Sequence, residues 1–343
     1  MLDGVSKDLL FAARRLRRAP GFLAVAVASL GMGVGVTAVA FSLLSSVSFR
    51  PLPFPEPDRL VDVYEYHPVQ VCPGCGVGTS YPNFTDWRAQ STSFASMAAY
   101  RTEALGWTGQ EAPARVQGVA SSPELFRLLG ARFVTGRPPL PADDRPGAAP
   151  VVVLGETFWR ERMGAHPDAL GSSLTLNGVP HTVVGVLADG LDFPAAAAVW
   201  LPLGPRVAGG ARDDRSVSVV ARLADGSDLP EAAAEIALIG RRLAEAYPEE
   251  DGGWSAHLVP LHADLASDYA PSFRLLLGAV CFVLLVACAN LAGLLLVRGA
   301  ERETELAVRS SMGASRWDLV RALLGEAVVV GVLGGGVGLL VAW

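Results

Sequence analysis

The sequence predicts an α+β extracytoplasmic domain inserted between transmembrane α-helices. Three stretches without a charged residue raise the mean hydropathy to +0.35, and they lie at 21–49, 275–297 and 327–343. A spanning helix needs about 20 apolar residues, so the first two stretches are long enough and the third nearly so. The section between the first two stretches mixes strand and helix patterns, which is typical of an α+β domain.

The charges of the chain predict which side of the membrane each part occupies. Residues 1–50 carry a net charge of +4 and residues 271–343 of +1, so the total of −6 leaves −11 for residues 51–270. Basic residues beside a span stay in the cytoplasm. The chain therefore starts inside, the acidic middle lies outside, and the segment after the second span returns inside. The acidic middle lacks a basic stripe, which argues against nucleic-acid binding.

These patterns divide the chain into six segments. We expect a cytoplasmic amphipathic helix at 1–20, a first transmembrane helix at 21–49 and an extracytoplasmic α+β core domain at 50–272. A second transmembrane helix follows at 274–298, then a cytoplasmic coupling elbow at 299–325 and the start of a third span at 326–343, which the end of the chain cuts short. A cleaved signal peptide is the alternative for the first apolar stretch, which is much longer than a signal peptide needs.

Several elements of the middle section can be predicted individually. The run 151–154 is a short buried strand and 156–163 an amphipathic helix. Asn177-Gly178 lies between two strand patterns and supplies the positive φ angles of a tight hairpin turn. A helix begins near residue 81 with Asn83 or Thr85 as its cap, another covers 230–247, and a closing strand covers 254–261.

Small and polar residues within the apolar stretches predict close helix packing. Gly31 and Gly35 form a small-x-x-x-small face, and Gly334 and Gly338 form another. Asn290 is strongly polar and lies deep in the second span, where an amide normally bonds to a neighbouring helix.

Motifs for catalysis or cofactor binding are missing from the sequence. There is no Walker A stretch, no Gly-x-Ser-x-Gly and no His-Glu-x-x-His, so we expect no enzyme activity, no cofactor and no metal. The one local motif is Cys72-Pro-Gly-Cys75. A structural disulfide is favoured in an oxidising compartment, while free thiols and redox or metal chemistry remain alternatives.

Three groups of residues carry a family resemblance. The stretch 14–20, with the proline-rich exit after Arg50, is similar to the start of MacB/FtsX-type ABC transporter permeases. Ser122-Pro-Glu-Leu-Phe-Arg-Leu-Leu-Gly130 and the section 151–193 are similar to their periplasmic core domain. Ala287-Cys-Ala-Asn290, Glu305-Leu-Ala-Val-Arg309 and Met312-Gly-Ala-Ser-Arg316 are similar to their FtsX-like membrane domain.

The resemblance implies a permease subunit of an export or mechanotransmission system in the bacterial inner membrane. Its partners would be a separate ABC ATPase subunit, membrane lipid, a periplasmic adaptor and a second permease chain in a homo- or heterodimer. The family's ATPase-facing elbow maps onto five residues: Glu305, Arg309, Gly313, Ala314 and Ser315. Since such permeases have at least four spans, the chain is expected to be C-terminally truncated. The alternatives are a membrane-anchored scaffold or regulator of a cell-wall enzyme, and a non-functional truncated permease.

Overall fold

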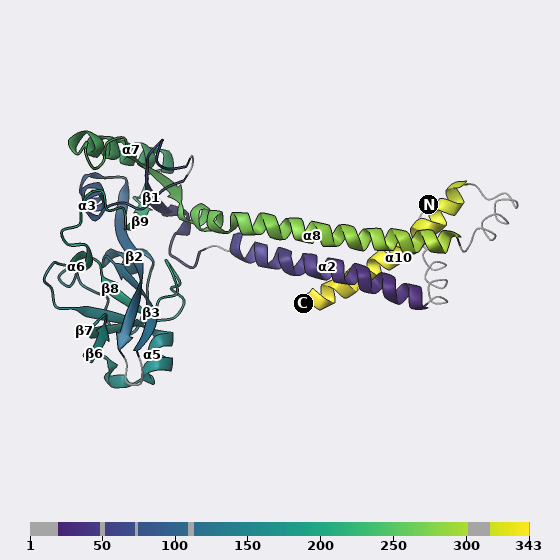
Figure 1. Ribbon diagram of the computed structural model, residues 1–343, viewed down its shortest axis with the longest axis horizontal. Coiled ribbons are helices and arrows are strands. Elements are labelled where there is room, and N and C mark those ends of the chain that lie inside the picture. The colour runs from purple at the N-terminus through teal and green to yellow at the C-terminus, as the bar shows by residue number, and fades with distance from the viewer. Residues whose placement is uncertain (1–19, 49–51, 73–74, 109–112, 301–315, 343) are drawn as a thin grey trace. The chain divides into compact units, whose positions relative to one another are not determined.

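The computed structural model describes residues 20–48, 52–72, 75–108, 113–300 and 316–342 (Figure 1). The chain forms two compact units, of which one is the domain Pro51–Leu265 and the other contains the apolar helices before and after it in the sequence. The amphipathic helix expected at 1–20 lies outside the described residues except for Pro20, and so does most of the expected elbow at 299–325.

Ten strands of the domain form one mixed sheet. They run in the order β10-β1-β9-β2-β3-β8-β5-β7-β4, with β6 pairing to both β2 and β7. The pairs β3–β8 and β5–β7 are parallel and the other pairs are antiparallel. The strands are β1 (Leu60–Tyr66), β2 (Phe94–Thr108), β3 (Pro113–Ser121), β4 (Phe133–Gly136), β5 (Val151–Gly155), β6 (Ser173–Leu176), β7 (Val179–Leu187), β8 (Val199–Pro202), β9 (Ser218–Leu223) and β10 (Ser255–Pro260).

Helices of the domain are mostly short, whereas the apolar helices are long. The domain contains α3 (Tyr81–Gln90), α4 (Glu124–Leu128), α5 (Glu156–Met163), α6 (Gly204–Val207) and α7 (Leu229–Ala246), with 3₁₀ turns at Pro57–Arg59 and Pro167–Ala169. The long helices are α2 (Pro20–Ser48), α8 (Leu261–Ala300) and α10 (Arg316–Ala342).

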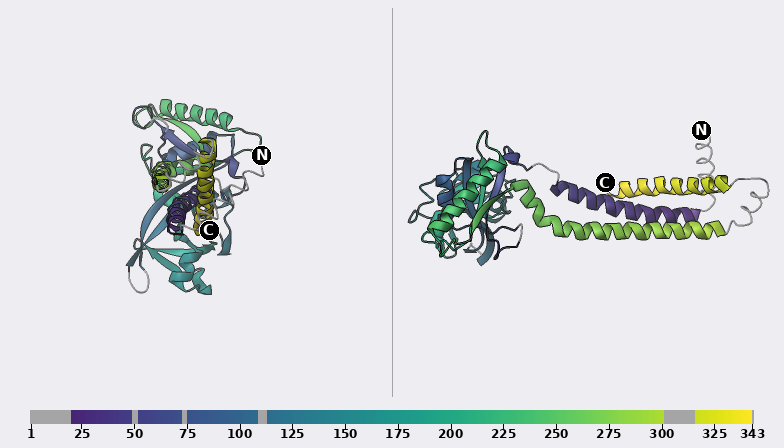
Figure 2. Two further views of the ribbon diagram at one scale, coloured as in Figure 1. Left: turned by 90° about the vertical axis from the view of Figure 1, so that its right-hand side faces the viewer. Right: turned by 90° about the horizontal axis from the view of Figure 1, so that it is seen from above.

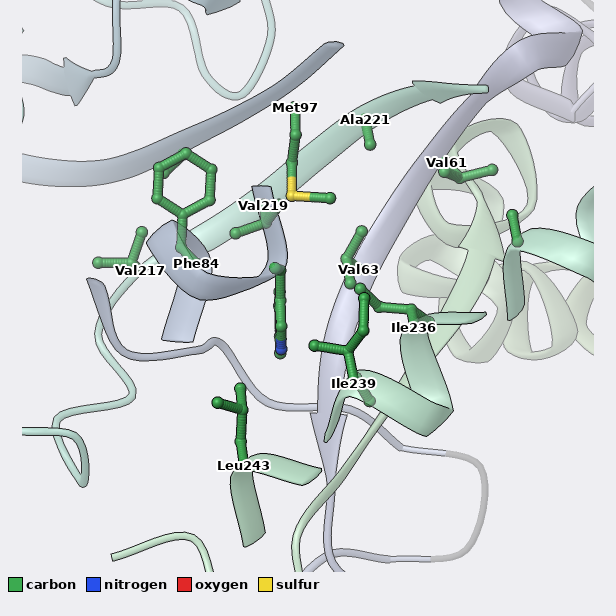
Figure 3. Close-up of a cluster of buried hydrophobic side chains, with 14 of the residues drawn as sticks. Val61, Val63, Phe84, Met97, Val217, Val219, Ala221, Ile236, Ile239 and Leu243 are labelled. Atoms are coloured by element: carbon green, nitrogen blue, oxygen red, sulfur yellow. The ribbon is translucent and has the colours of Figure 1, made fainter. Parts of the chain in front are cut away.

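Helix α7 shows how the sequence builds the first part of the domain core. Its cap residue Asp228 accepts a hydrogen bond from the Glu231 backbone N–H at 2.8 Å, which satisfies one of the free donors at the helix start. Ile236, Ile239 and Leu243 recur at helical spacing and are buried. They meet side chains of β1, β2, β9 and α3 in one apolar cluster, drawn in Figure 3.

The predicted hairpin and the helix before it are confirmed. Asn177 and Gly178 have φ angles of 49° and 80°, as a two-residue turn of this kind requires, and join the antiparallel strands β6 and β7. Helix α5 covers the residues predicted for it and ends at Gly164, whose φ angle of 64° fits a glycine cap.

The predicted cap of α3 is wrong. The cap is Ser80, whose hydroxyl accepts a hydrogen bond from the Asn83 backbone N–H at 3.2 Å. Asn83 and Thr85 lie inside the helix, and the side chain of Asn83 is buried among charged residues instead.

Two described helices are long and apolar enough to cross a membrane, with candidate spans at Pro20–Ala40 and Arg274–Leu294; Ala327–Ala342 is a shorter apolar stretch. Figure 2 shows α2 between α8 and α10. Helix α8 begins at Leu261, well before residue 274 where the second span was expected to start. Residues 262–273 are helical and form the first turns of α8.

Candidate functional site at β1 and the start of α8

Strand β1 places two polar groups on opposite faces of the sheet, because neighbouring strand residues point in opposite directions. Val61 and Val63 belong to the core beneath α3 and α7, while Leu60 packs in a second core that contains Leu261. Glu65 follows the two valines on the first face, and Tyr64 follows Leu60 on the second. One strand therefore connects a buried carboxylate with the start of α8.

Glu65 is the centre of a group that we call the polar cluster. The residue is buried, with only 2% of its surface exposed. Carboxylate oxygen Oε1 accepts hydrogen bonds from Thr79 Oγ1 at 2.5 Å and from Asn83 Nδ2 at 2.9 Å. The second oxygen, Oε2, lies 2.5 Å from Arg215 Nε. The polar cluster consists of Glu65, Thr79, Asn83, Arg212, Arg215 and Asp251.

A second buried carboxylate, Asp251, shares two of these partners. Its Oδ1 accepts from Asn83 Nδ2 at 3.0 Å and lies 3.1 Å from Arg215 Nη2. The Arg215 guanidinium also stacks on Trp254, 3.7 Å from the ring centroid. One arginine thus holds two carboxylates and an aromatic ring, which suits its planar, delocalised charge.

Arg212 extends the polar cluster to the outside of α3. It donates to Asn83 Oδ1 at 2.5 Å, pairs with Asp86 at 2.7 Å and stacks 3.7 Å above the ring of Tyr247. The segments around residues 212–215 and 247–254 are therefore joined through two stacked arginines.

The protonation of the polar cluster follows from burial and from Arg215. Burial raises the pKa of Glu65 and of Asp251, whereas the hydrogen bonds from Asn83 and the charge of Arg215 act in the opposite direction on both. Removing Arg215 would take away one of the effects that oppose burial, so the pKa of each carboxyl would rise further. The members therefore stabilise the fold as a set, and loss of one is costly.

On the other face of β1, Tyr64 is bonded to the first turn of α8. Tyr64 Oη donates to Asp264 Oδ2 at 2.6 Å, and the ring lies 5.8 Å from that of His257 on β10. Burial raises the pKa of the Tyr64 hydroxyl, so the group remains a donor. Leu261 is completely buried, and Leu265 packs against the same core. An apolar contact and a hydrogen bond together fix the helix start to the domain.

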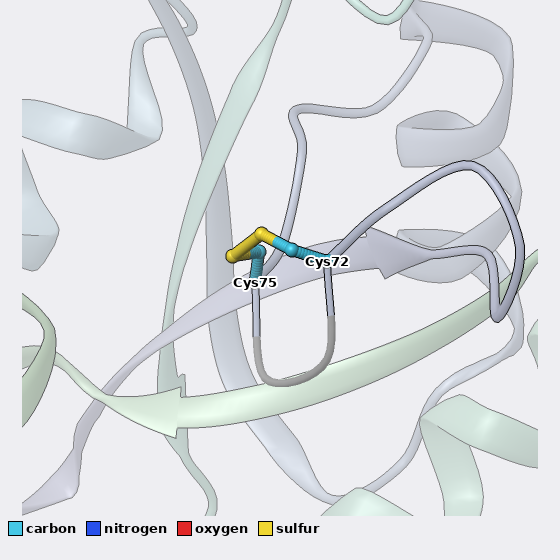
Figure 4. The surroundings of a disulfide bond; sticks show 2 residues. All are labelled: Cys72 and Cys75. Atoms are coloured by element: carbon cyan, nitrogen blue, oxygen red, sulfur yellow. A yellow bond between two sulfur atoms is a disulfide. The ribbon is translucent and has the colours of Figure 1, made fainter.

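The segment that contains Cys72 and Cys75 leads to Gly76, which lies against Tyr64. The two cysteines form a disulfide with a Cα–Cα distance of 5.3 Å (Figure 4). A Cβ on Gly76 would lie 2.5 Å from Tyr64 Cβ, so only glycine allows this approach. Val77 then exchanges two backbone hydrogen bonds of 3.0 Å with Glu65. The disulfide closes a turn directly before the segment that pairs with β1.

A cleft of about 320 Å³ lies elsewhere in the domain, beside α5 and the segment 187–198. Phe158, Leu191 and Trp200 line its apolar part, and Asp189 is among its acidic residues. Asp189 Oδ1 accepts hydrogen bonds from the backbone N–H and hydroxyl of Thr157, so this carboxylate serves the local fold. Among the described residues, no group of three or more His, Cys, Asp and Glu side chains is placed to hold a metal ion.

The glycines predicted for helix packing lie where α2 meets α10. A Cβ built on Gly31 would lie 3.3 Å from Gly334 O, and one on Gly35 would lie 3.2 Å from Gly338 O. A Cβ on Gly338 would lie only 2.7 Å from Gly31 O. We call these four residues the glycine seam. Their missing side chains allow the two backbones to come close.

The other predicted residues are not brought together with the glycine seam. Asn290 lies on α8 with its side chain exposed in this chain. The five elbow residues, Glu305, Arg309, Gly313, Ala314 and Ser315, lie outside the described residues.

Sequence reasoning missed the polar cluster and the bond between Tyr64 and Asp264. The partners of Glu65 lie 14, 18 and 150 positions away in the sequence, as the residue numbers of Thr79, Asn83 and Arg215 show. One signal was available, because Glu65 occupies an inward position of a strand whose other inward residues are valines. A charge at such a position needs buried partners.

Comparison with known proteins identifies both parts of the chain. Residues 23–239 match the model of the MacB-like periplasmic core domain, and residues 277–343 match that of the FtsX-like permease C-terminal region. The macrolide export ATP-binding/permease protein MacB of Nitrobacter winogradskyi is 31% identical over 57% of this chain and 30% of its own length. The pyoverdine export ATP-binding/permease protein PvdT of Pseudomonas entomophila is 30% identical over 59% of this chain and 31% of its own length.

The chain thus spans about a third of the length of these curated relatives. Among solved structures, the periplasmic region of MacB from Actinobacillus actinomycetemcomitans matches 58% of this chain and 87% of its own, with 15% identity and a TM-score of 0.44.

We predict that Glu65→Ala destabilises the domain by about 3–5 kcal/mol, because it leaves the buried Arg215 without one of its two carboxylates. Urea unfolding of the purified full chain measures this. Asp225→Ala is the control, since it removes the partner of Arg59 at a residue whose side chain is 96% exposed. Equal losses in the two variants would show that the polar cluster does not hold the domain.

We predict that Gly338→Ala weakens the packing of α2 on α10 by about 1–3 kcal/mol, because the new methyl group meets the Gly31 carbonyl. Gly336→Ala on the same helix is the control, because a Cβ there has no atom within 4 Å. The measurement is thermal unfolding in detergent. A Gly338→Ala variant as stable as Gly336→Ala would contradict the close approach.

Proposed function

Since this chain belongs to the MacB/FtsX-type family of ABC transporter permeases, we propose that it transmits motion driven by a separate ATPase to its periplasmic domain. The moving element is α8, and the domain acts on a molecule outside the membrane. The proposal rests on one observation above all. Strand β10 ends at Pro260 and α8 begins at the next residue, so no loop separates the sheet from the helix that contains the second candidate span.

The start of α8 supports the proposal because it is fixed in the domain. Leu261 is buried in the core, and Asp264 accepts the hydrogen bond from Tyr64. A helix that begins in a packed core passes a displacement to that core, whereas a flexible linker would absorb it. Pro271 lacks a backbone N–H and removes one intrahelical hydrogen bond, so α8 has a place to bend without becoming a loop.

From β10 and α8 a displacement can reach the rest of the sheet through β1. The strand pairs with β10 over six residues and with β9 on its other edge. The polar cluster connects the same strand with α3 and with the segments around residues 215 and 251. Because the interior is close-packed, a displacement of β1 moves the strands and side chains around it together rather than one residue at a time.

Charge distribution supports the orientation that the proposal needs. Basic residues before the first candidate span and after the second favour the cytoplasm for both of those ends, and the acidic domain is then on the periplasmic side. In this arrangement the elbow residues, among them Glu305 and Arg309, face the ATPase. The relatives are named for macrolide and pyoverdine export. For this chain we propose export or extraction of a lipophilic or peptide-like molecule, with a periplasmic adaptor and a second permease chain as further partners.

We predict that an ABC ATPase co-purifies with the chain from native membranes in mild detergent. Replacing Glu305 and Arg309 together by Ala should weaken the association about tenfold, equivalent to about 1.4 kcal/mol. Binding of the purified ATPase to immobilised permease measures the change. The control is Glu161→Ala in the periplasmic domain, which should leave the affinity unchanged. Purification of the chain with a cell-wall enzyme and no ATPase would contradict the proposal.

We predict that a flexible insertion in α8 uncouples export from ATPase binding. Gly-Ser-Gly-Ser inserted after Ser267 should abolish most export while ATPase binding persists, because it replaces a helical connection with a coil. Ala-Ala-Ala-Ala at the same place adds about one helical turn and should retain more export. Both variants are compared in a vesicle transport assay. Equal export by the two variants would show that α8 need not be continuous.

A further inference from the structure

A small pocket lies where the polar cluster meets the apolar core beneath α3 and α7. Its volume, counted as space open to the centre of a water molecule, is about 10 Å³. Trp87 from α3, Glu65 from β1 and Asp251 from the segment after α7 line its polar part, and Leu243 lines its apolar part. Trp87, Glu65 and Asp251 are each at least 97% buried.

Three buried polar atoms on these residues form no hydrogen bond with any described residue. They are Trp87 Nε1, which is a donor, and Asp251 Oδ2 and Glu65 Oε2, which are acceptors. Glu65 Oε2 has the charge of Arg215 Nε at 2.5 Å but no hydrogen-bond geometry with it. Folded proteins satisfy nearly all buried polar groups, with ordered water where protein partners do not reach. Three such atoms on residues that line one pocket therefore point to a common ligand.

The donor and acceptor pattern selects the ligand. Water donates up to two hydrogen bonds and accepts up to two, so it can accept from one indole N–H and donate to two carboxylate oxygens. A metal cation would be repelled by the indole proton and by the charge of Arg215, and an anion would be repelled by the two carboxylates. Ammonium has no lone pair with which to accept a hydrogen bond from the indole N–H. A volume of about 10 Å³ is at the lower limit for one water molecule and too small for two.

We propose that one water molecule is bound in this cavity, accepting a hydrogen bond from Trp87 Nε1 and donating to Asp251 Oδ2 and Glu65 Oε2. The water completes the hydrogen bonding of the polar cluster. It connects α3, β1 and the segment after α7 through a single buried molecule. This inference concerns the domain alone and does not depend on the transport proposal.

The test is an NMR measurement on the full chain in nanodiscs, with ¹⁵N-labelled tryptophan. Trp87→Phe identifies the Trp87 indole signal by its disappearance. A bound water gives dipolar cross-peaks between water and the indole proton that change sign between NOE and ROE spectra, whereas peaks from proton exchange keep their sign. Trp159 is the control, because its Nε1 donates to His166 O at 3.1 Å and should show no such dipolar peak.

The expected result is a dipolar water peak at Trp87 together with slow exchange of the indole proton. An indole proton that exchanges slowly without a water peak would show a dry cavity and overturn the proposal. If Trp87→Phe does not fold, Asp251→Asn provides the second route. It preserves the volume but changes one partner of the water, so it should shift the Trp87 indole signal and leave that of Trp159 in place. An unshifted signal in Asp251→Asn would also contradict a shared water.

Discussion

The side chain of Leu261 lies completely inside the core of the domain Pro51–Leu265, although it is the first residue of a helix that contains a candidate membrane span. Leu60 and Phe126 pack in the same core, and the Tyr64–Asp264 hydrogen bond adds a directional contact one turn later. Burial of such side chains is worth about 1.5–3 kcal/mol each. A displacement of α8 along its axis must break these contacts or move the sheet with it, and the proposed transmission depends on this constraint.

The polar cluster sets a second constraint, on the opposite face of the same strand. A buried carboxylate such as Glu65 is tolerated only with hydrogen-bond donors and a cation around it, and those partners come from α3 and two connecting segments. Apolar packing can slide into alternative arrangements, whereas a charge network has few arrangements that satisfy every member. We therefore infer that the polar cluster fixes the position of β1 relative to α3, α7 and β9.

Local signals in the sequence identified much of the fold, while contacts between distant residues could not be derived from it. Asn177-Gly178 and α5 were predictable, because turn geometry and helical spacing depend on neighbouring residues. The helical glycines were found as pairs within each helix, but the meeting of Gly31 with Gly334 joins residues about three hundred positions apart. The early start of α8 was missed because residues 262–273 mix polar and apolar side chains, and such a mixture does not distinguish a loop from a helix that leaves a core. Ser80 caps α3 because its hydroxyl lies directly before the first turn of the helix. The Asn83 side chain instead donates hydrogen bonds to the carboxylates of Glu65 and Asp251.

The most direct measurement is hydrogen–deuterium exchange of the full chain with its ATPase in nanodiscs, compared between the nucleotide-free and ATP-bound states. The account predicts that ATP changes the exchange of backbone amides in the β1 segment 60–66 and in the β10–α8 segment 255–265, both far along the chain from the elbow. An unchanged pattern in these two segments, with changes limited to residues after 299, would contradict transmission through α8.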